Sequence, residues 1–166
     1  MPGANSHRHL SAMGHVHLRR REGVRNYYYN DVANHCTYGV GTLAHRGPCT
    51  AEELHAPVTE EQINRSLIKE VLYSERVVRN AVRYYELTQE QFDAAVSFAY
   101  NLPGRTPRVF GPANRGDMAS VARNIESHNK ITPHDKNGVA TGPAKVSKGL
   151  ANRRREEAAP FWEATR

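Results

Sequence analysis

Three residues near the start of the chain have side chains that could together cleave a glycosidic bond: Glu22, Asp31 and Thr37. The reaction needs a carboxylic acid that protonates the leaving oxygen and a carboxylate that activates water or attacks the sugar carbon. We expect Glu22 at the C-terminal end of a helix, where the helix dipole and partial desolvation favour a protonated carboxyl. We expect Asp31 in a polar turn, where solvent and hydrogen-bond donors favour the ionised form. These environments predict one acid and one carboxylate, with Thr37 placed to hold a water beside Asp31.

The types and spacing of these residues do not by themselves separate a catalytic pair from ordinary surface acids. Perturbed carboxylates mark functional sites only statistically. A cluster of positive charge also surrounds Glu22 in the sequence and would favour its ionised form if the side chains faced it: Arg19, Arg20, Arg21 and Arg25. The catalytic interpretation therefore depends on the elements that position the three residues.

The first part of the chain is expected to form a short helix and a small antiparallel sheet. Ser11 suits an N-cap, and Gly23 suits the end of a helix whose last residue is Glu22. The stretches "VRNYYY" and "CTYGVG" favour strands, and "NDVANH" between them is rich in turn residues, which predicts a hairpin. A third short strand is expected at 42–46, followed by a loop at 47–57.

The rest of the chain has helical character. Two Thr-x-x-Gln sequences predict capping boxes: Thr59 with Gln62, and Thr88 with Gln91. The first opens a long helix with an apolar stripe, formed by Ile63, Leu67, Val71 and Val78 and widened by Ile68 and Leu72. The second opens a helix that Pro103 and Gly104 stop. Further helices are expected at 118–128, where Asp117 is the cap, and at 150–162, with a loop at 129–149 between them.

This order of elements predicts an α+β fold in a single domain of residues 1–166. We expect a loose arm at 1–10, a sheet lobe at 23–58, a connecting helix at 59–85 and a helical lobe at 86–166, with a cleft between the lobes. The run "RRREE" in the last helix is interpreted mainly as a solvated face with internal charge pairs.

The composition fits one globular domain with a core of its own, at 39% hydrophobic and 24% charged residues. The net charge of +6 allows a polyanionic partner such as nucleic acid, an anionic membrane or an acidic wall polymer. No apolar run is long enough to cross a membrane and the opening lacks the core of a secretory signal, so we expect synthesis into a cytoplasm. Cys36 and Cys49 are expected to be reduced there, with a single bridge after release into an oxidising space as the alternative.

Three stretches of the chain resemble the phage-type lysozymes, the endolysins with which phages open the host wall. The run from Glu22 through Asp31 to Thr37, followed by "YGVG", resembles the family's Glu-x8-Asp-x5-Thr signature. The stretch "LTQEQFDAAVSFAYNLPG" is similar to the family helix "LTxxQFDALVSFAFNxG", and "KGLANRRREEAAPFW" to its closing "GLxxRRxxExxLW". They occur in the expected order and together cover most of residues 11–163.

The resemblance implies a lysozyme-like fold, a small antiparallel sheet lobe and a larger helical lobe joined by a long helix. It implies a muramidase that hydrolyses the β-1,4 bond between N-acetylmuramic acid and N-acetylglucosamine in peptidoglycan. Glu22 would be the general acid, Asp31 the second carboxylate and Thr37 the group that positions water. The setting implied is lysis at the end of infection by a monomer without cofactor, which reaches the periplasm and wall from the host cytoplasm after a holin permeabilises the membrane.

The resemblance also suggests residues around this group. In the family an arginine of the final helix supports the catalytic glutamate, and the position here is Arg153 or Arg154. Asn101 and Tyr38 are candidates for contacts with sugar. The chain departs from the family at Asn34, where glycine is usual, although asparagine also suits a left-handed turn. It departs again at Thr42, where a histidine often follows the second glycine.

Other interpretations remain open on the sequence. A lytic transglycosylase cuts the same bond with one acid, but Asp31 and Thr37 favour water as the nucleophile. A non-enzymatic cationic binder of nucleic acid or lipid would use the basic charge without Glu22. A zinc site is not expected, because the residues with suitable atoms match no paired Cys-x2-Cys spacing: His35, Cys36, His45 and Cys49.

Overall fold

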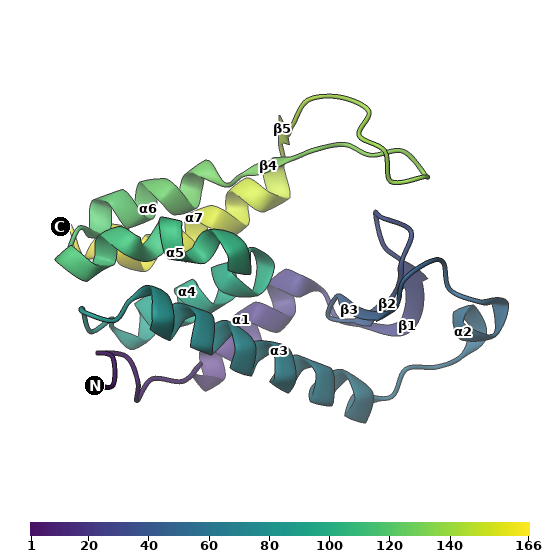
Figure 1. Ribbon diagram of the computed structural model, residues 1–166, viewed down its shortest axis with the longest axis horizontal. Helices are drawn as coiled ribbons and strands as arrows, with labels where there is room; N and C mark the ends of the chain where they lie inside the picture. The colour runs from purple at the N-terminus through teal and green to yellow at the C-terminus, as the bar shows by residue number, and fades with distance from the viewer. The chain divides into compact units, whose positions relative to one another are not determined.

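The computed structural model describes residues 1–166 and has the mixed α+β composition that the sequence predicted (Figure 1). In chain order the elements are α1 (Ala12–Glu22), β1 (Arg25–Asn30), β2 (Cys36–Gly39), β3 (Thr42–His45), α2 (Ala51–His55), α3 (Glu60–Ala81), α4 (Gln89–Asn101), η1 (Pro103–Arg105), α5 (Thr106–Phe110), η2 (Gly111–Arg115), α6 (Met118–Ser127), β4 (Lys130–Ile131), β5 (Lys145–Val146) and α7 (Lys148–Glu163). None of the helices combines the length and apolar character that crossing a membrane requires.

Two compact units make up the chain. The sheet unit comprises residues 18–69 and 131–145, and the helical unit comprises residues 1–17, 70–130 and 146–166. The boundaries fall inside α1 and α3, so each of these helices contributes residues to both units. The lobe boundaries expected after residues 58 and 85 do not coincide with these positions.

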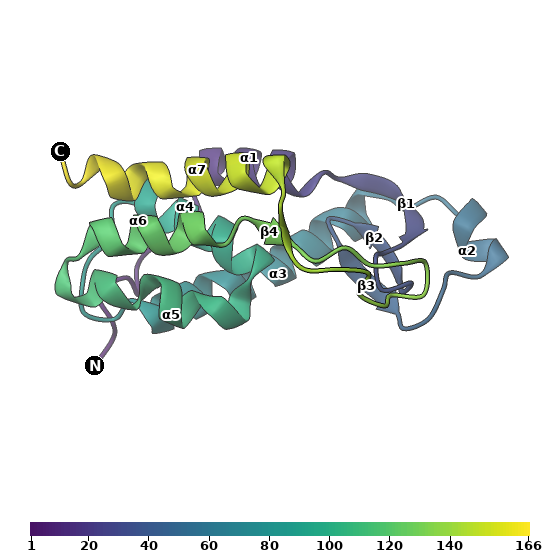
Figure 2. The same ribbon diagram turned by 90° about the horizontal axis from the view of Figure 1, so that it is seen from above.

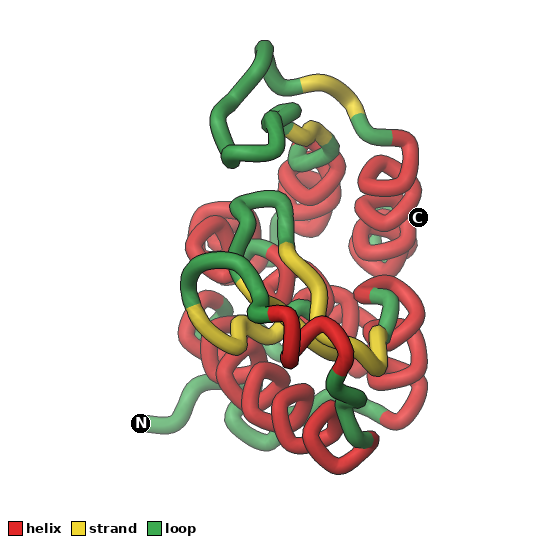
Figure 3. The backbone as a smooth tube through the Cα atoms, turned by 90° about the vertical axis from the view of Figure 1, so that its right-hand side faces the viewer, coloured by secondary structure: helices red, strands yellow, loops and turns green.

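The sheet unit is built on three antiparallel strands in the order β1-β2-β3, which Figure 3 shows in yellow between loops. Tyr29 pairs with Thr37, and Asn30 pairs with Cys36. Cys36 pairs in turn with His45 of β3. The hairpin and the third strand are as predicted, because runs of tyrosine and other strand formers are separated by residues that favour turns.

The segment expected as a loop at 47–57 contains a short helix, α2. Thr50 caps it: the Thr50 side chain accepts the Glu53 N–H at 3.1 Å, and the Glu53 carboxylate accepts the Thr50 N–H at 2.8 Å. Thr-x-x-Glu is a capping-box sequence, so the signal for this helix was present in the chain. It was missed because Gly47, Pro48 and Pro57 give the whole segment the composition of a loop.

The helical unit has an aromatic core drawn from helices distant in sequence. Phe92, Phe98, Phe110 and Phe161 are fully buried. The ring centroids of Phe98 and Phe110 lie 5.5 Å apart, and those of Phe110 and Phe161 lie 5.6 Å apart. Helices α6 and α7 run side by side in both Figure 1 and Figure 2. The capping box of Thr88 that opens α4 is present as predicted.

Helix α3 follows its predicted pattern with two corrections. Ile63, Leu67, Val71 and Val78 are all buried. Ile68 and Leu72 do not widen the buried stripe, since their exposed fractions are 57% and 55%. Each lies one residue beyond a stripe position, which turns it by about 100° around the helix axis.

The long helix also ends earlier than expected, at Ala81 rather than at residue 85. The Asn114 side chain accepts the backbone N–H groups of Arg83 and Tyr84 at 2.9 and 3.0 Å. Because a side chain from a distant segment takes over these donors, the helix ladder does not need to continue through them.

The first ten residues are not the loose arm that their composition suggested. Asn5 is fully buried; its amide donates to the carbonyls of Val82 and Tyr85 at 2.8 Å each, and its carbonyl oxygen accepts the Leu87 N–H at 2.8 Å. The Leu10 N–H donates to the Glu75 carboxylate at 2.6 Å. One asparagine thus satisfies three backbone groups beyond the end of α3, and composition carries no signal for such a contact.

The interpretation of "RRREE" as a solvated face was wrong at two positions. Arg154 and Glu157 are both fully buried. The Arg154 Nη1 lies 2.5 Å from Glu157 Oε1, and the Ser97 hydroxyl donates to Glu157 Oε2 at 2.6 Å. The Arg154 guanidinium carbon also lies 4.7 Å from the centroid of the Phe98 ring. The buried charges are therefore paired and covered within the helical unit.

Candidate active site

Asp31 is held in the tight turn that joins β1 to β2. Its Oδ1 accepts the N–H groups of Ala33 and His35 at 2.9 and 2.8 Å, and its own N–H donates to the His35 carbonyl at 3.0 Å. Asn34 adopts φ 61°, the left-handed conformation that asparagine tolerates and that was predicted from the usual glycine at this position. Both side-chain bonds of the turn use Oδ1, so Oδ2 takes no part in holding the turn.

Glu22 is the last residue of α1, as the sequence predicted. The helix ends there because Gly23 takes φ 66° and donates its N–H to the Arg19 carbonyl at 3.1 Å. That backbone conformation suits glycine and would strain most other residues. The Oε1 atom of Glu22 is shielded from solvent. Its carboxyl group is therefore partly desolvated and fixed at the junction between α1 and β1.

Thr37 lies on β2, directly across from Tyr29 of β1. The side chain is buried, with 3% of the residue exposed, and its hydroxyl donates to the His35 carbonyl at 3.0 Å. A hydroxyl that gives its hydrogen to a carbonyl keeps its oxygen as an acceptor. Thr37 can therefore orient a water by accepting one of the water's hydrogens.

Tyr29 is a residue of this site that sequence analysis treated only as a strand aromatic. Burial raises the pKa of its hydroxyl above the ordinary 10.0; Arg25 lowers it, and the charges of Asp31 and Glu22 raise it. The Arg25 guanidinium carbon stands 4.2 Å from the centroid of the Tyr29 ring. Glu22 and Asp31, from opposite ends of β1, thus both act electrostatically on one hydroxyl group. Sequence alone gave no signal for this, because the pairing of Tyr29 with Thr37, which puts both side chains on one face of the sheet, depends on the strand register.

Tyr38 is not brought to this group. Its hydroxyl is hydrogen-bonded to the Ser66 hydroxyl at 2.8 Å, and its ring lies 5.5 Å from the ring of Tyr28. Successive residues of a strand point to opposite faces, so Tyr38 and Thr37 leave β2 on different sides. Tyr38 packs the sheet against α3, and its contact with a sugar stays a prediction.

Asn101, Arg153 and Arg154 belong to the helical unit. Arg154 donates to the Asn101 side-chain oxygen and, at 2.8 Å, to the His128 carbonyl. Arg153 donates to the Ser97 carbonyl at 2.9 Å and contacts Glu157 at 3.2 Å. These contacts order the closing helix within its own unit. The support of Glu22 by Arg153 or Arg154, and sugar binding by Asn101, stay predictions.

A second group of reactive side chains lies beside the base of the turn that carries Asp31, where Cys36 pairs with Asn30. Cys36 and Cys49 form a disulfide with Cα atoms 4.6 Å apart, so the expectation of two reduced cysteines was wrong for this structure. The expectation rested on compartment alone, whereas the pairing of β2 with the segment after β3 brings the two residues together. His45 contacts Glu53 at 2.7 Å; hydrogen bonds to the Arg46 carbonyl and to Glu53 raise the pKa of His45 above 6.5.

Comparison with known proteins identifies relatives over nearly the whole chain. The pattern of the family described as Phage lysozyme matches residues 19–157. The endolysin from Escherichia coli O157:H7 phage FAHEc1 is 28% identical, with a TM-score of 0.77 over 97% of this chain and 96% of that chain. The muramidase domain of SpmX from Asticaccaulis excentricus is 26% identical, with a TM-score of 0.72 over 93% of this chain and 98% of that chain.

The active form of the P1 phage endolysin Lyz shares the fold, with a TM-score of 0.68 at 20% identity over 98% of this chain and 89% of that chain. No curated protein gives a significant sequence match.

Proposed function

Because the chain belongs to the phage lysozyme family, we propose that Glu22, Asp31 and Thr37 are the catalytic residues of a peptidoglycan-cleaving enzyme. The chain is a lysozyme, a glycoside hydrolase. We propose that the bond it cleaves is the β-1,4 bond between N-acetylmuramic acid and N-acetylglucosamine. The muramidase relative supports the proposed bond class, and the positions of the three side chains support their proposed roles.

In the proposed reaction, Glu22 gives its proton to the glycosidic oxygen as the bond to the sugar carbon breaks. Charge that develops on the sugar carbon is stabilised by the Asp31 carboxylate, whose Oδ2 is not used by the turn. Thr37 accepts a hydrogen bond from the attacking water, because its own hydrogen is committed to the His35 carbonyl, and the proton that the water loses passes to the Asp31 carboxylate.

One observation carries this proposal: the charges of both Glu22 and Asp31 act on the hydroxyl of Tyr29. Both carboxylates thus act in the same direction on the pKa of one hydroxyl group of the sheet. Glycoside hydrolysis requires such a pair, whereas a cationic binding protein has no need of it.

The products of digestion test the reaction directly. Purified peptidoglycan should be cleaved to fragments that end in reducing N-acetylmuramic acid, each having gained one water at the broken bond. Mass spectrometry of the reduced fragments identifies this end group. Fragments that end in anhydro-muramic acid would contradict the proposed hydrolysis and support a lytic transglycosylase, in which the sugar's own hydroxyl replaces water.

We further propose that the enzyme lyses the host cell at the end of phage infection, passing from the host cytoplasm to the wall after a holin permeabilises the membrane. Support comes from the family and from the endolysin relative. Expression in Gram-negative cells should cause little lysis until a holin or a membrane-permeabilising agent is added. Rapid lysis by the chain alone would contradict the need for a holin.

A further inference from the structure

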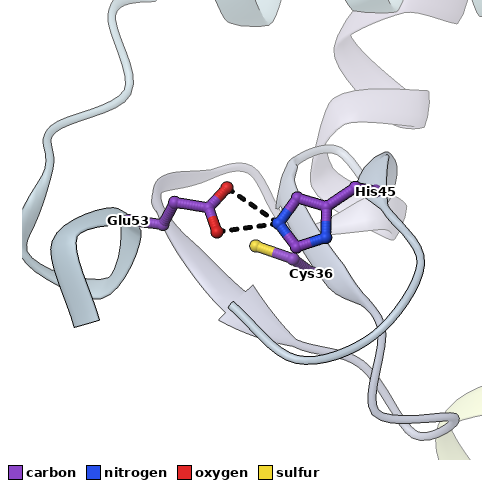
Figure 4. Close-up of side chains that lie close together, drawn as sticks. All are labelled: Cys36, His45 and Glu53. Atoms are coloured by element: carbon purple, nitrogen blue, oxygen red, sulfur yellow. Dashed lines mark hydrogen bonds and ion pairs between the residues drawn. The ribbon is translucent and has the colours of Figure 1, made fainter. Parts of the chain in front are cut away.

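Cys36, His45 and Glu53 bring a sulfur, an imidazole nitrogen and a carboxylate together in the sheet unit. One ligand atom from each lies within 4.8 Å of the others. Figure 4 shows the Glu53 carboxylate directed at a His45 ring nitrogen, with the Cys36 sulfur beside them. The residues come from three elements, β2, β3 and α2. None of them has a role in the proposed hydrolysis, so their grouping needs a separate explanation.

The hydrogen bonds of His45 leave one particular nitrogen facing this group. Nδ1 lies 2.9 Å from the Arg46 carbonyl oxygen, and Nε2 lies 2.7 and 2.9 Å from the two Glu53 oxygens. A carbonyl oxygen only accepts, so Nδ1 carries a hydrogen. A histidine that binds a metal through one nitrogen commonly donates the other N–H to a backbone carbonyl, which fixes the tautomer and the ring. His45 has that arrangement, with Nε2 on the side of Glu53.

The disulfide determines whether sulfur can join the group. The Sγ atoms of Cys36 and Cys49 are bonded to each other, and the thiolate rather than the disulfide is the form that ligates metals. Reduction would leave two thiols at the place of the bridge. Together with His45 and Glu53 they make two sulfur ligands, one nitrogen and one oxygen. Four ligands of these types suit tetrahedral zinc.

We propose that reduction of the Cys36–Cys49 bridge converts this group into a zinc site formed by Cys36, Cys49, His45 and Glu53. In a reducing compartment, two molecules of a small thiol reduce the bridge; they leave as one small disulfide, and their two hydrogens remain on the protein sulfurs. Zinc binding then releases the two thiol protons to water, together with any proton on His45 Nε2. The inference does not depend on the proposed function.

In either redox state, the two cysteines would hold together the base of the turn that carries Asp31. The Cys36 N–H donates to the Gly47 carbonyl at 2.8 Å, and the Cys49 N–H donates to the Asn30 side chain at 2.7 Å. These contacts place the bridge at the base of the turn that carries Asp31. A covalent bridge would hold this base in an oxidising space, and zinc would hold it where thiols are reduced.

Metal content of the full chain in its two redox states tests the proposal. The protein is incubated with zinc chloride, with or without a phosphine reductant, and then passed through a desalting column. The phosphine takes the oxygen of one water, and the two hydrogens of that water go to the two sulfurs. We expect about one zinc per reduced chain and almost none per oxidised chain. Cobalt in place of zinc should give the visible absorption of a tetrahedral thiolate site only after reduction.

Two variants identify the ligands. H45A and E53Q should each weaken zinc binding by the reduced chain more than about tenfold. E53Q keeps a residue that can form the capping box of α2, so it tests the carboxylate even if H45A folds poorly. The matched control is H55A, since His55 lies on α2, is exposed, and bonds only the Ala51 carbonyl through Nδ1 in the contacts described.

Three results would overturn the zinc site: no zinc on the reduced chain, equal zinc on the oxidised and reduced chains, or unchanged affinity in both H45A and E53Q. Far-ultraviolet circular dichroism reports whether the reduced chain stays folded. A reduced chain that loses structure and does not regain it with zinc would also contradict the proposal.

Discussion

Asp31 combines two tasks in one side chain, which is typical of how this site is built. One carboxylate oxygen accepts two backbone N–H groups and so fixes the turn, and the other oxygen is left for the substrate. Thr37 likewise gives its hydrogen to a backbone carbonyl and keeps its oxygen for water. The structural role and the proposed chemical role thus share one side chain at each of these residues. Substitutions at these residues will therefore alter stability as well as activity.

The titration of Tyr29 reports on the proposed gathering of the two acids. Its pKa should lie above 10.0, because burial and the charges of Asp31 and Glu22 outweigh Arg25. Tyr29 in the folded state therefore keeps its proton longer than in the unfolded state, so its contribution to stability is lost as the pH rises above 10.0. E22Q and D31N should each lower the pKa of Tyr29. Nuclear magnetic resonance of ring-labelled tyrosine measures it.

One finding for this titration would count against the site geometry. A pKa of Tyr29 that neither E22Q nor D31N changes would mean that the carboxylates are too distant to act on it. R25Q serves as the control of opposite sign, since removal of the Arg25 charge should raise the pKa of Tyr29.

At the scale of helices, strands and turns, the features that depend on residues close together in the sequence could be predicted. The capping boxes at Thr59 and Thr88 and the turn at Asn34 depend on side chains within a few residues, and all three are present. The exposure of Ile68 could not be predicted in the same way, because an apolar residue beside a helical stripe is buried only if another element covers it. The facing of Tyr29 toward both acids also required the strand register.

The cap of α6 gives the fold a defined response to acid. The Asp117 carboxylate accepts the Ser120 N–H at 3.1 Å and the Ser120 hydroxyl at 2.6 Å, and these bonds lower the pKa of Asp117 below 3.8. Because the pKa of Asp117 is lowered on folding, the cap stabilises the protein above pH 3.8. This stabilisation is lost as the pH falls through the pKa that Asp117 has in the folded state. D117N should lose less stability over this range than the wild type. Urea unfolding at several pH values below 5 or so measures the difference.

If the wild type and D117N lose stability equally as the pH falls, the Asp117 carboxyl group is not charged in the folded protein. S120A removes the hydrogen bond that the Ser120 hydroxyl donates to Asp117 and leaves the charge of Asp117 unchanged. Its loss of stability in acid should lie between those of the wild type and D117N.

On the scale of the whole molecule, the parts missed by sequence analysis are contacts between distant segments. Asn5 reaches the segment after α3, and Arg154 and Glu157 are buried beside Ser97 of α4. In the sheet unit, Gly138 from the 131–145 segment lies against Ala33 of the Asp31 turn, where an added Cβ would be 3.5 Å from the Ala33 Cα. The resemblance could give the order of elements, but composition and periodicity carry no signal for such pairs.

The buried pair of Arg154 and Glu157 should dominate the stability of the closing helix. E157Q removes the carboxylate of Glu157 from a pair with no solvent exposure, and removal of one partner of a buried pair costs about 3–5 kcal/mol. We expect the free energy of unfolding to fall by that amount in urea. E163Q, an exposed position at the end of the same helix, should change it by less than about 0.5 kcal/mol. Equal effects of the two variants would mean that the buried charges contribute no more than surface charges.

The most direct test of the central claim is the activity of E22Q on purified peptidoglycan. Glutamine keeps the shape of the side chain but has no proton to give to the leaving oxygen. We expect kcat/KM to fall by about 10²–10⁴-fold, with the unfolding midpoint close to that of the wild type. E163Q is the control for loss of one carboxylate and should keep full activity. A folded E22Q enzyme that cleaves peptidoglycan as fast as the wild type would contradict the account of Glu22 as the general acid.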